Sequence, residues 1–283
     1  MSASNIKFTP RKSEERGGAN HGWLKTFHTF SFANYQDEAF EQYGPLRVIN
    51  EDRVIPTQGF GTHAHREFEI FSYILDGQLT HRDSLHNTEI LKRGDLQMTS
   101  TGTGIRHSEF NDNPKEGVHF LQIWAMPHTR GLKPNYYTRH VSDEEKRDKL
   151  VRIVAPVGAE GVKDEREAAG PAPVHSWLSM SASLLSPKAS VSHTVSRPFN
   201  PSAKTQAKRV YLHLVQSSGY NTRASYTHAD AAKVKVSAKG KDIEGVVLGE
   251  GDGMFIDGGV EGDVVEIESV GGREAEFVLF EMD

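Results

Sequence analysis

The sequence contains no cysteine among its 283 residues, which excludes disulfide bonds and thiolate chemistry. Hydrophobic runs are short, and none approaches the ~18 residues that a membrane-spanning helix requires. We therefore expect no membrane segment. Residues 1–20 also lack the apolar core of about 7–15 residues that a secretory signal contains. We expect a location in the cytoplasm, with the nucleus as the alternative.

A strongly basic charge is missing as well. The formal net charge is −5, with 33 Lys and Arg against 38 Asp and Glu. Such a balance provides no general attraction to the phosphates of nucleic acids, so we expect no direct nucleic-acid binding. The basic cluster of the N-terminal segment, Arg11, Lys12 and Arg16, is interrupted by Glu14 and Glu15.

Two spaced pairs of residues with metal-ligand side chains bracket most of the segment 59–109. The first pair is His63-x-His65 and the second is His107-x-Glu109. Residues two apart on a strand point to the same face, and the apolar runs between the pairs are typical of strands. Each pair can therefore direct both of its side chains toward one centre. Three imidazoles and one carboxylate from two distant strands predict a divalent metal site.

Most of the 14 histidines should be ordinary surface or core residues. A single His-x-His pair would be weak evidence of a metal site. The second pair, in the same phase and after a glycine-containing turn, makes metal binding the better interpretation. His175, His193, His213 and His228 have no second donor at ligand spacing. We interpret these four as structural and expect no metal in the second half of the chain.

Short alternating strands separated by turn residues predict an all-β fold. Asp76-Gly77 lies between two alternating runs and predicts a hairpin, and Gly102 with Gly104 predicts a sharp bend. Ser142 and Glu145 form a capping-box pattern that predicts a short, charged, solvent-exposed helix. We place the domain boundary there, between residues 1–140 with the metal site and residues 141–283.

The second half repeats the strand pattern of the first. Gly251-Asp252-Gly253 resembles Gly94-Asp95, which hints at an internal duplication. Both sequences stand between alternating runs, where a turn is expected. The two predicted domains should therefore share one architecture.

The segments HAHREFEI, GDLQ and GTGIRHSE, with the flanking HGWLKTFHTFSFANY and LRVINEDRV, resemble the pirin family of the cupin superfamily. The resemblance is dense over 16–124 and thinner beyond. It implies two tandem cupin-type β-barrels (a bicupin) with few short helices. It also implies one divalent metal held by His63, His65, His107 and Glu109. Fe(II) is the first choice, and Mn, Ni, Co, Cu or Zn would suit the same donors.

Glu69 is an open alternative to Glu109 as the carboxylate ligand. Many single-barrel cupins place their ligating glutamate near the position of Glu69, which also shares the sequence phase of His65. Pirins use the glutamate of the second pair, so the resemblance favours Glu109 and leaves Glu69 lining the pocket or supporting a ligand. The sequence departs from the family pattern at Glu67, where a small residue is common, and at His86, where glycine is expected.

Two functions follow from the resemblance. One is a flavonol (quercetin) 2,3-dioxygenase that uses O2, in which Glu109 accepts the proton of the flavonol 3-hydroxyl as general base. Phe60, Phe71, Gln122 and Trp124 would line the pocket, or they are plain barrel core. The other function is a non-enzymatic, metal- and redox-sensing nuclear co-regulator that binds a transcription factor. A metal-stabilised protein without turnover fits the sequence equally well. We expect a monomer.

Overall fold

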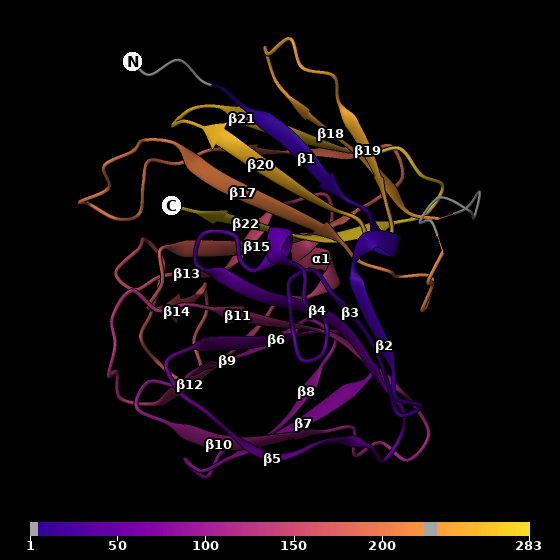
Figure 1. The fold of residues 1–283 in the computed structure, drawn as a ribbon, viewed down its shortest axis with the longest axis vertical. Coiled ribbons are helices and arrows are strands. Elements are labelled where there is room, and N and C mark those ends of the chain that lie inside the picture. The colour runs from indigo at the N-terminus through magenta and orange to yellow at the C-terminus, as the bar shows by residue number, and fades with distance from the viewer. Residues whose placement is uncertain (1–4, 224–230) are drawn as a thin grey trace. The chain divides into compact units, whose positions relative to one another are not determined.

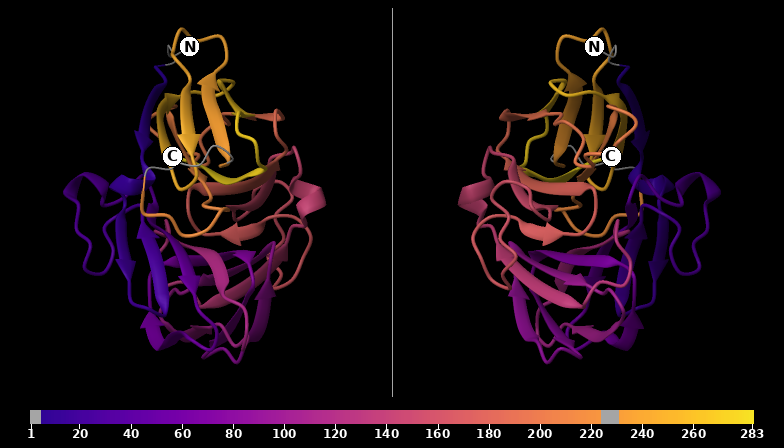
Figure 2. Two further views of the ribbon diagram at one scale, coloured as in Figure 1. Left: turned by 90° about the vertical axis from the view of Figure 1, so that its right-hand side faces the viewer. Right: turned by 90° about the vertical axis from the view of Figure 1, so that its left-hand side faces the viewer.

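The computed structural model describes residues 5–223 and 231–283. Strands make up nearly all of its regular structure, which confirms the all-β prediction (Figure 1). The chain forms two compact units, and each is built from β-sheets (Figure 2). The described residues include no helix of the length and hydrophobicity needed to cross a lipid bilayer.

The two units are not continuous in sequence. The N-terminal barrel comprises Gly17–Ser142 and Ile153–Ser176, and the C-terminal barrel comprises the segment up to Arg16, Asp143–Arg152 and Trp177–Asp283. The domain division between residues 1–140 and 141–283 stays a prediction. Strand pairing explains why the N-terminal segment belongs to the C-terminal barrel, because Lys7–Arg11 (β1) pairs antiparallel with Gly253–Gly259 (β20) there.

Two sheets enclose the interior of the N-terminal barrel. One has the order β12-β9-β6-β11-β4-β3-β2 and the other has the order β5-β10-β7-β8. The strand bounds are β2 Gly17–Asn20, β3 Leu24–His28, β4 Leu46–Val54, β5 Gly59–His65, β6 Glu69–Asp76, β7 Gln78–Asp83, β8 Thr88–Lys92, β9 Asp95–Ser100, β10 Ile105–Phe110, β11 Val118–Ala125 and β12 Asn135–His140. A 3-10 turn, Glu38–Phe40 (η2), lies between β3 and β4, and Val151–Pro156 (β13) pairs in parallel with Ala172–Val174 (β14).

An apolar cluster packs inside this barrel. Its buried members come from both sheets and are Leu24, Val54, Ile74, Leu79, Leu91, Val118 and Phe120. Because these side chains alternate with residues of the opposite face along each strand, the same period of two that identified the strands also fixes which residues point inward.

Glycine-containing turns carry the chain from one sheet to the other. The Asp76-Gly77 turn joins β6 to β7, which belong to different sheets, so the predicted hairpin is wrong and the turn is a corner of the barrel. Gly77 has a φ of +76°, and a Cβ there would lie 2.2 Å from the carbonyl oxygen of Gly117. Only glycine fits both conditions. Gly102, with a φ of +43°, forms the predicted bend between β9 and β10.

The C-terminal barrel repeats the topology of the N-terminal barrel. Its strands follow the orders β1-β20-β17-β22-β15 and β16-β21-β18-β19. The run β20-β17-β22-β15 corresponds to β9-β6-β11-β4 of the N-terminal barrel, and the run β16-β21-β18-β19 corresponds to β5-β10-β7-β8. The bounds are β15 Leu178–Leu185, β16 Ser190–Thr194, β17 Lys208–Leu214, β18 Lys233–Ala238, β19 Val246–Gly249, β21 Val264–Ser269 and β22 Ala275–Met282, with a 3-10 turn at Ser13–Glu15 (η1). The two Gly-Asp turns also match: Asp95 accepts the N–H of Lys92, and Asp252 accepts the N–H of Gly249.

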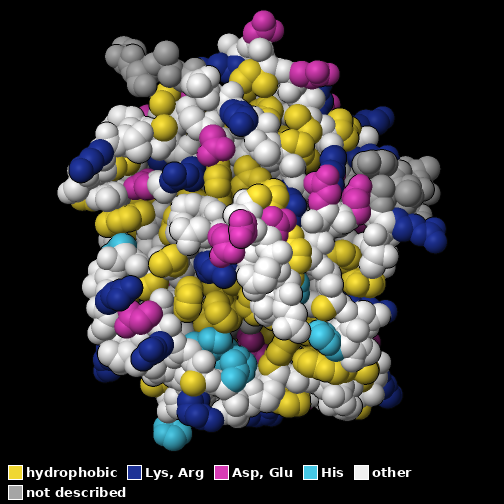
Figure 3. All heavy atoms as spheres, viewed as in Figure 1, with side chains coloured by type: hydrophobic (Ala, Val, Ile, Leu, Met, Phe, Trp, Pro, Cys, Tyr) yellow, Lys and Arg dark blue, Asp and Glu magenta, His cyan; other side chains and the backbone are white. Residues whose placement is uncertain are grey.

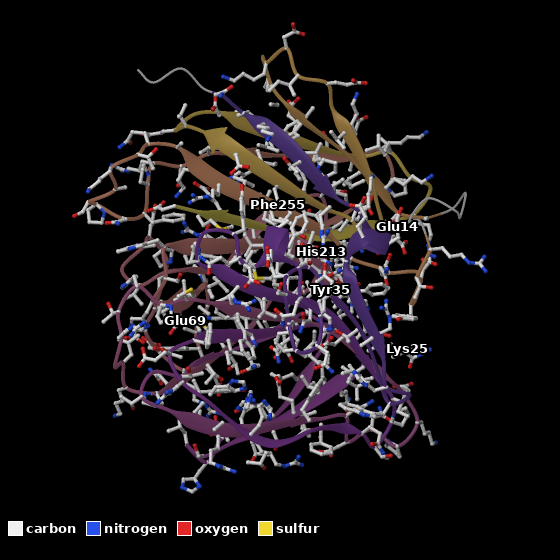
Figure 4. All side chains as sticks on the ribbon, in the orientation of Figure 1. Glu14, Lys25, Tyr35, Glu69, His213 and Phe255 are labelled. Carbon is white, nitrogen blue, oxygen red and sulfur yellow. The ribbon has the colours of Figure 1, made fainter. Side chains whose placement is uncertain are left out.

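Apolar side chains fill the interior of the C-terminal barrel. β18 contributes Val234 and Val236, and β21 contributes Val265 and Ile267, all buried in one core cluster. These strands correspond to β7 and β10 of the N-terminal barrel. His213, labelled in Figure 4, is fully buried on β17. The structural role of the histidines of the second half stays a prediction. His228 lies outside the described residues.

The predicted short helix is present as Asp143–Lys146 (α1). The expectation that all of its charges face solvent is wrong for Lys146, whose side chain is fully buried. Its ammonium group forms ion pairs with Glu276 on β22 and with Asp143. A buried charge requires such partners, and no pattern within the helix itself reveals a partner that is 130 residues away.

Candidate metal centre

The two motif strands β5 and β10 pair antiparallel and bring the predicted histidines together. Their register places His63 directly opposite His107, and His65, two residues further along β5, faces the same side. The ligand nitrogens of the three imidazoles lie within 4.8 Å of one another. Nε2 of His63 and Nε2 of His107 are 3.1 Å apart.

The hydrogen bonds of the imidazoles leave nitrogen lone pairs directed at this centre. Nδ1 of His63 lies 2.7 Å from the carbonyl oxygen of Gly61. A carbonyl only accepts, so Nδ1 carries the proton and Nε2 keeps a lone pair. Metal-binding histidines commonly donate their other ring nitrogen in this way. Nε2 of His65 is buried and has no hydrogen-bond partner within the described part of the chain.

Burial keeps two of these imidazoles neutral. Desolvation, followed by repulsion from neighbouring histidines, lowers the pKa of His65 to about 4. Desolvation also lowers the pKa of His107 to about 4, although the Glu109 carboxylate opposes the shift. Both side chains are therefore uncharged at neutral pH, and the neutral form is the one that binds metals.

Glu109 lies on the same strand as His107 but turns toward a different neighbour. A β-bulge shifts the register between these two residues, so that Glu109 pairs with Phe60 on β5. The other edge of β10 pairs with β7 in regular register, and this pairing places Glu109 opposite His81. Bulges redirect side chains in this way beside functional sites. Glu109 consequently shares a group of potential metal ligands with His81 and His107.

Three polar side chains hold the buried Glu109 carboxylate. Ser72 donates from Oγ to Oε1 at 2.6 Å, and Gln122 donates from Nε2 to Oε2 at 2.6 Å. Gln97 donates a longer bond of 3.4 Å to Oε1. A carboxylate accepts about four hydrogen bonds, so one acceptor position remains free for a metal ion.

Electrostatics keep Glu109 ionised despite its burial. Desolvation alone would raise the pKa of Glu109. Attraction to His107 and His81 in their protonated forms, together with the hydrogen bonds from Ser72 and Gln122, outweighs that effect and lowers the pKa. The site therefore contains a carboxylate anion beside neutral imidazoles, which suits a divalent cation.

The three donors to Glu109 form a row across the larger sheet. Gln122 on β11 pairs with Ser72 on β6, and Ser72 pairs with Gln97 on β9. Paired positions face the same side, so the row points at Glu109. The sequence predicts that Gln122 is a pocket wall or plain barrel core, and sequence reasoning does not identify Ser72 or Gln97. Their signal was a polar residue at an inward position of an otherwise apolar run.

His81 was also missed by the sequence reasoning. It is fully buried on β7, and the same strand places Asp83 opposite His107. The signal is present in the sequence as His81-Arg82-Asp83, a third pair of ligand-type residues two apart in one strand.

Glu69, the alternative carboxylate, is engaged elsewhere. It accepts a hydrogen bond of 2.6 Å from Ser100 Oγ and one of 3.1 Å from the backbone N–H of His175. Figure 4 shows Glu69 well apart from strands β5 and β10. Glu69 and His65 lie on different strands, so their shared sequence phase does not give them a shared direction. His175 belongs to the N-terminal barrel and not to the second domain.

Aromatic side chains stand next to the histidine cluster. The Trp124 ring contacts His65 edge to face at 4.8 Å between centroids, and Phe32 and Phe68 pack against Trp124. Phe71 is fully buried and precedes Ser72 on β6. Its side chain therefore points to the opposite face of the sheet and does not line the pocket. Figure 3 shows a hollow in the lower part of the molecule, with histidine and acidic side chains in it and hydrophobic side chains around it.

Both departures from the pirin pattern occupy the left-handed backbone region. Glu67 has a φ of +59° and His86 has a φ of +67°, values that favour glycine. The Glu67 carboxylate accepts the backbone N–H of Gly131 at 3.1 Å. His86 is exposed. Neither side chain takes part in the donor groups described above.

The duplicated topology and the inward-facing histidines define a two-barrel protein of the cupin type with a metal-compatible site. Residues 9–125 match the family model of pirin. The crystal structure of YhhW from Escherichia coli is 31% identical, with 98% of each chain covered and a TM-score of 0.76. A second structure is described as bacterial pirin YhhW in complex with nickel(II), with 31% identity, 98% and 99% coverage and a TM-score of 0.74. The chain belongs to the pirin family.

Curated relatives match about half of the chain. A protein from E. coli (strain K12) named quercetin 2,3-dioxygenase is 52% identical over 129 residues, which are 46% of this chain. A pirin-like protein from Caulobacter vibrioides is 39% identical over 155 residues, or 55% of this chain. The chain spans 56% and 64% of the lengths of these two relatives.

Proposed function

We propose that this protein is a metal-dependent dioxygenase of the pirin type that uses O2 to open a flavonol such as quercetin. The observation that carries the proposal is the convergence of His63, His65 and His107 inside the N-terminal barrel, beside the ionised Glu109. The 52% identity to the E. coli protein named quercetin 2,3-dioxygenase supports the substrate class.

His63, His65, His107 and Glu109 would hold the metal. The nitrogen lone pairs and the one free acceptor position of Glu109 fit a single divalent ion of the transition series. We propose Fe(II), while the nickel(II) complex of a relative supports other divalent ions at such a site. When bound, the metal supplies Lewis-acid charge for an oxyanion and a path for electrons to O2.

Glu109 has two roles in this proposal, ligand and proton acceptor. Its lowered pKa makes it a weak base, because proton transfer is efficient when the pKa of the base lies near the working pH. The base role therefore requires that the pKa of the flavonol hydroxyl be lowered first. Ser72 and Gln122 would hold the carboxylate in position as it takes up the proton.

The aromatic residues beside the histidines suit a flat aromatic substrate. Trp124 lies against His65, and Phe32 and Phe68 extend the aromatic surface from there. Such rings bind a planar ligand by offset or edge-to-face contacts. A flavonol could thereby place its oxygen atoms near the histidine cluster while its rings meet these side chains.

Oxygen uptake with quercetin tests the proposal. Protein loaded with Fe(II) should consume O2, and His63→Ala should abolish the metal-dependent uptake. The matched control is His140→Ala, since His140 is an exposed histidine of the same barrel that pairs with Asp95 at 2.6 Å. Equal uptake by the His63 variant and the control, or none by the wild type, would reject the dioxygenase function for quercetin.

The alternative of a nuclear co-regulator lacks support from the described residues. Arg11 and Arg16 of the N-terminal basic cluster are buried, and Lys12 pairs with Asp252. These side chains do not form an exposed basic strip that could meet a protein partner. The relatives named above are bacterial proteins. The transcription-factor partner and the monomeric state stay predictions.

A further inference from the structure

His81 is held in one orientation by a carboxylate. Its Nε2 lies 3.0 Å from Oδ2 of Asp83, and both side chains are fully buried. Asp83 also accepts hydrogen bonds from the side chain of Asn87 at 2.8 Å and from the backbone N–H of Leu85 at 2.8 Å. The ring of Tyr136 stacks on His81 at 4.8 Å between centroids. The imidazole therefore has little freedom to turn.

The second nitrogen of His81 is an unused acceptor. A carboxylate only accepts, so Nε2 of His81 carries a proton, and in the neutral imidazole Nδ1 is left as an acceptor. Nδ1 is buried and has no hydrogen-bond partner among the described residues. This is the arrangement of a metal-binding histidine whose other nitrogen donates to a carboxylate.

A second acceptor faces His81 from the paired strand. Glu109 stands directly opposite it, and potential ligand atoms of His81, His107 and Glu109 lie within 4.8 Å of one another. Nδ1 of His107 is buried without a partner as well, again within the described residues. Buried acceptors with no hydrogen between them repel each other, and a cation among them would remove the repulsion.

We propose that His81, His107 and Glu109 form an inner donor set that binds a divalent transition-metal ion. Two histidines and one carboxylate are a common ligand set for such ions. His107 and Glu109 belong both to this inner set and to the outer set that they form with His63 and His65, so the pocket offers an ion two neighbouring positions. The inference rests on the proposed function in that both require a metal in this barrel.

Removal of the outer set isolates the inner one. The test is calorimetric titration of metal-free protein with Ni(II), comparing the wild type with His63→Ala/His65→Ala. The side chains of His63 and His65 are only half-buried, so their truncation should leave the barrel folded. The double variant should still bind one ion, with a lower affinity than the wild type because two donors are lost. Addition of His81→Ala should weaken the residual binding at least tenfold further.

Asp83→Asn gives an independent test that leaves the buried volume unchanged. In the double-variant background it permits the other tautomer of His81, with a proton on Nδ1, and Ni(II) binding should weaken about 10–100-fold. Asp95→Asn is the matched control, because Asp95 pairs with the exposed His140. It should leave binding unchanged. This variant decides the question if the triple alanine variant fails to fold.

The possible results separate the two proposals. No Ni(II) binding by a double variant with native circular dichroism would overturn the inner set and leave the proposed function intact. Residual binding that is insensitive to both His81→Ala and Asp83→Asn would also overturn it. No stoichiometric binding by the wild type would reject the inner set together with the proposed metal enzyme.

Discussion

Ser72→Ala tests how strongly the polar row stabilises the Glu109 carboxylate. Ser72 donates its 2.6 Å hydrogen bond inside the barrel, where the carboxylate is fully buried. A hydrogen bond to a charged group contributes about 1.5–3 kcal/mol. Without this bond, the desolvation cost of the buried carboxylate is less well compensated. We expect metal-free Ser72→Ala to lose about 2 kcal/mol of unfolding free energy at pH 7 in urea denaturation followed by tryptophan fluorescence.

The pH dependence gives a second measure of the same bond. The pKa of Glu109 is lower in the folded state than in the unfolded chain. Its contribution to stability is therefore present above the unfolded pKa of about 4.3 and is lost as the pH falls through the folded pKa. The stability difference between wild type and Ser72→Ala should be largest near neutral pH and should shrink on acidification.

Ser183→Ala is the matched control. Ser183 is a fully buried serine on β15 of the C-terminal barrel, and its hydroxyl has no partner among the described residues. Removal of an unsatisfied hydroxyl should cost little or even stabilise the protein. Equal stability losses for the two variants, or a loss below about 0.5 kcal/mol for Ser72→Ala, would refute the role assigned to the polar row.

Three further predictions concern stability. His86→Gly should raise the unfolding free energy by about 1 kcal/mol, because His86 occupies the left-handed region; an unchanged melting temperature would contradict this. Lys146→Met should cost about 3–5 kcal/mol in urea denaturation, because it removes the buried ion pair with Glu276, and Glu276→Leu added to it should restore much of the loss. Burial raises the pKa of Asp52 to about 7, above its unfolded value of about 3.9, so wild-type stability falls as the pH rises from about 4 to about 7 and levels off above that. Asp52→Asn should remove that fall, and thermal melts at about pH 5 and pH 7 measure it.

Local patterns could predict the elements that depend on neighbours in sequence. The period of two identified the strands and showed that His63 and His65 share a face, as the structure confirms. The turn residues marked the corners of the barrel, but they could not show which sheet each strand joins. For that reason the Asp76-Gly77 pattern predicts a hairpin, where the structure has a corner between two sheets. The two-barrel topology was predicted from the resemblance to pirins and not from periodicity.

The surroundings of Glu109 depended on pairing between distant strands. Its three hydrogen-bond donors come from β6, β9 and β11, and nothing in the sequence of any one strand names its partners. The β-bulge beside His107 and the position of His81 opposite Glu109 are likewise properties of register. Register is decided by the whole sheet, because a shift of one residue turns every side chain to the other face.

The sequence by itself determined the all-β class, the lack of disulfides and the phase of the two histidine-containing pairs. The tertiary structure decided which side chains meet: His63 with His107, Glu109 with His81, and Lys146 with Glu276. The physical reason is that a period of two fixes only the face on which a side chain lies. Contact between strands far apart in the chain depends on how the sheets align and close.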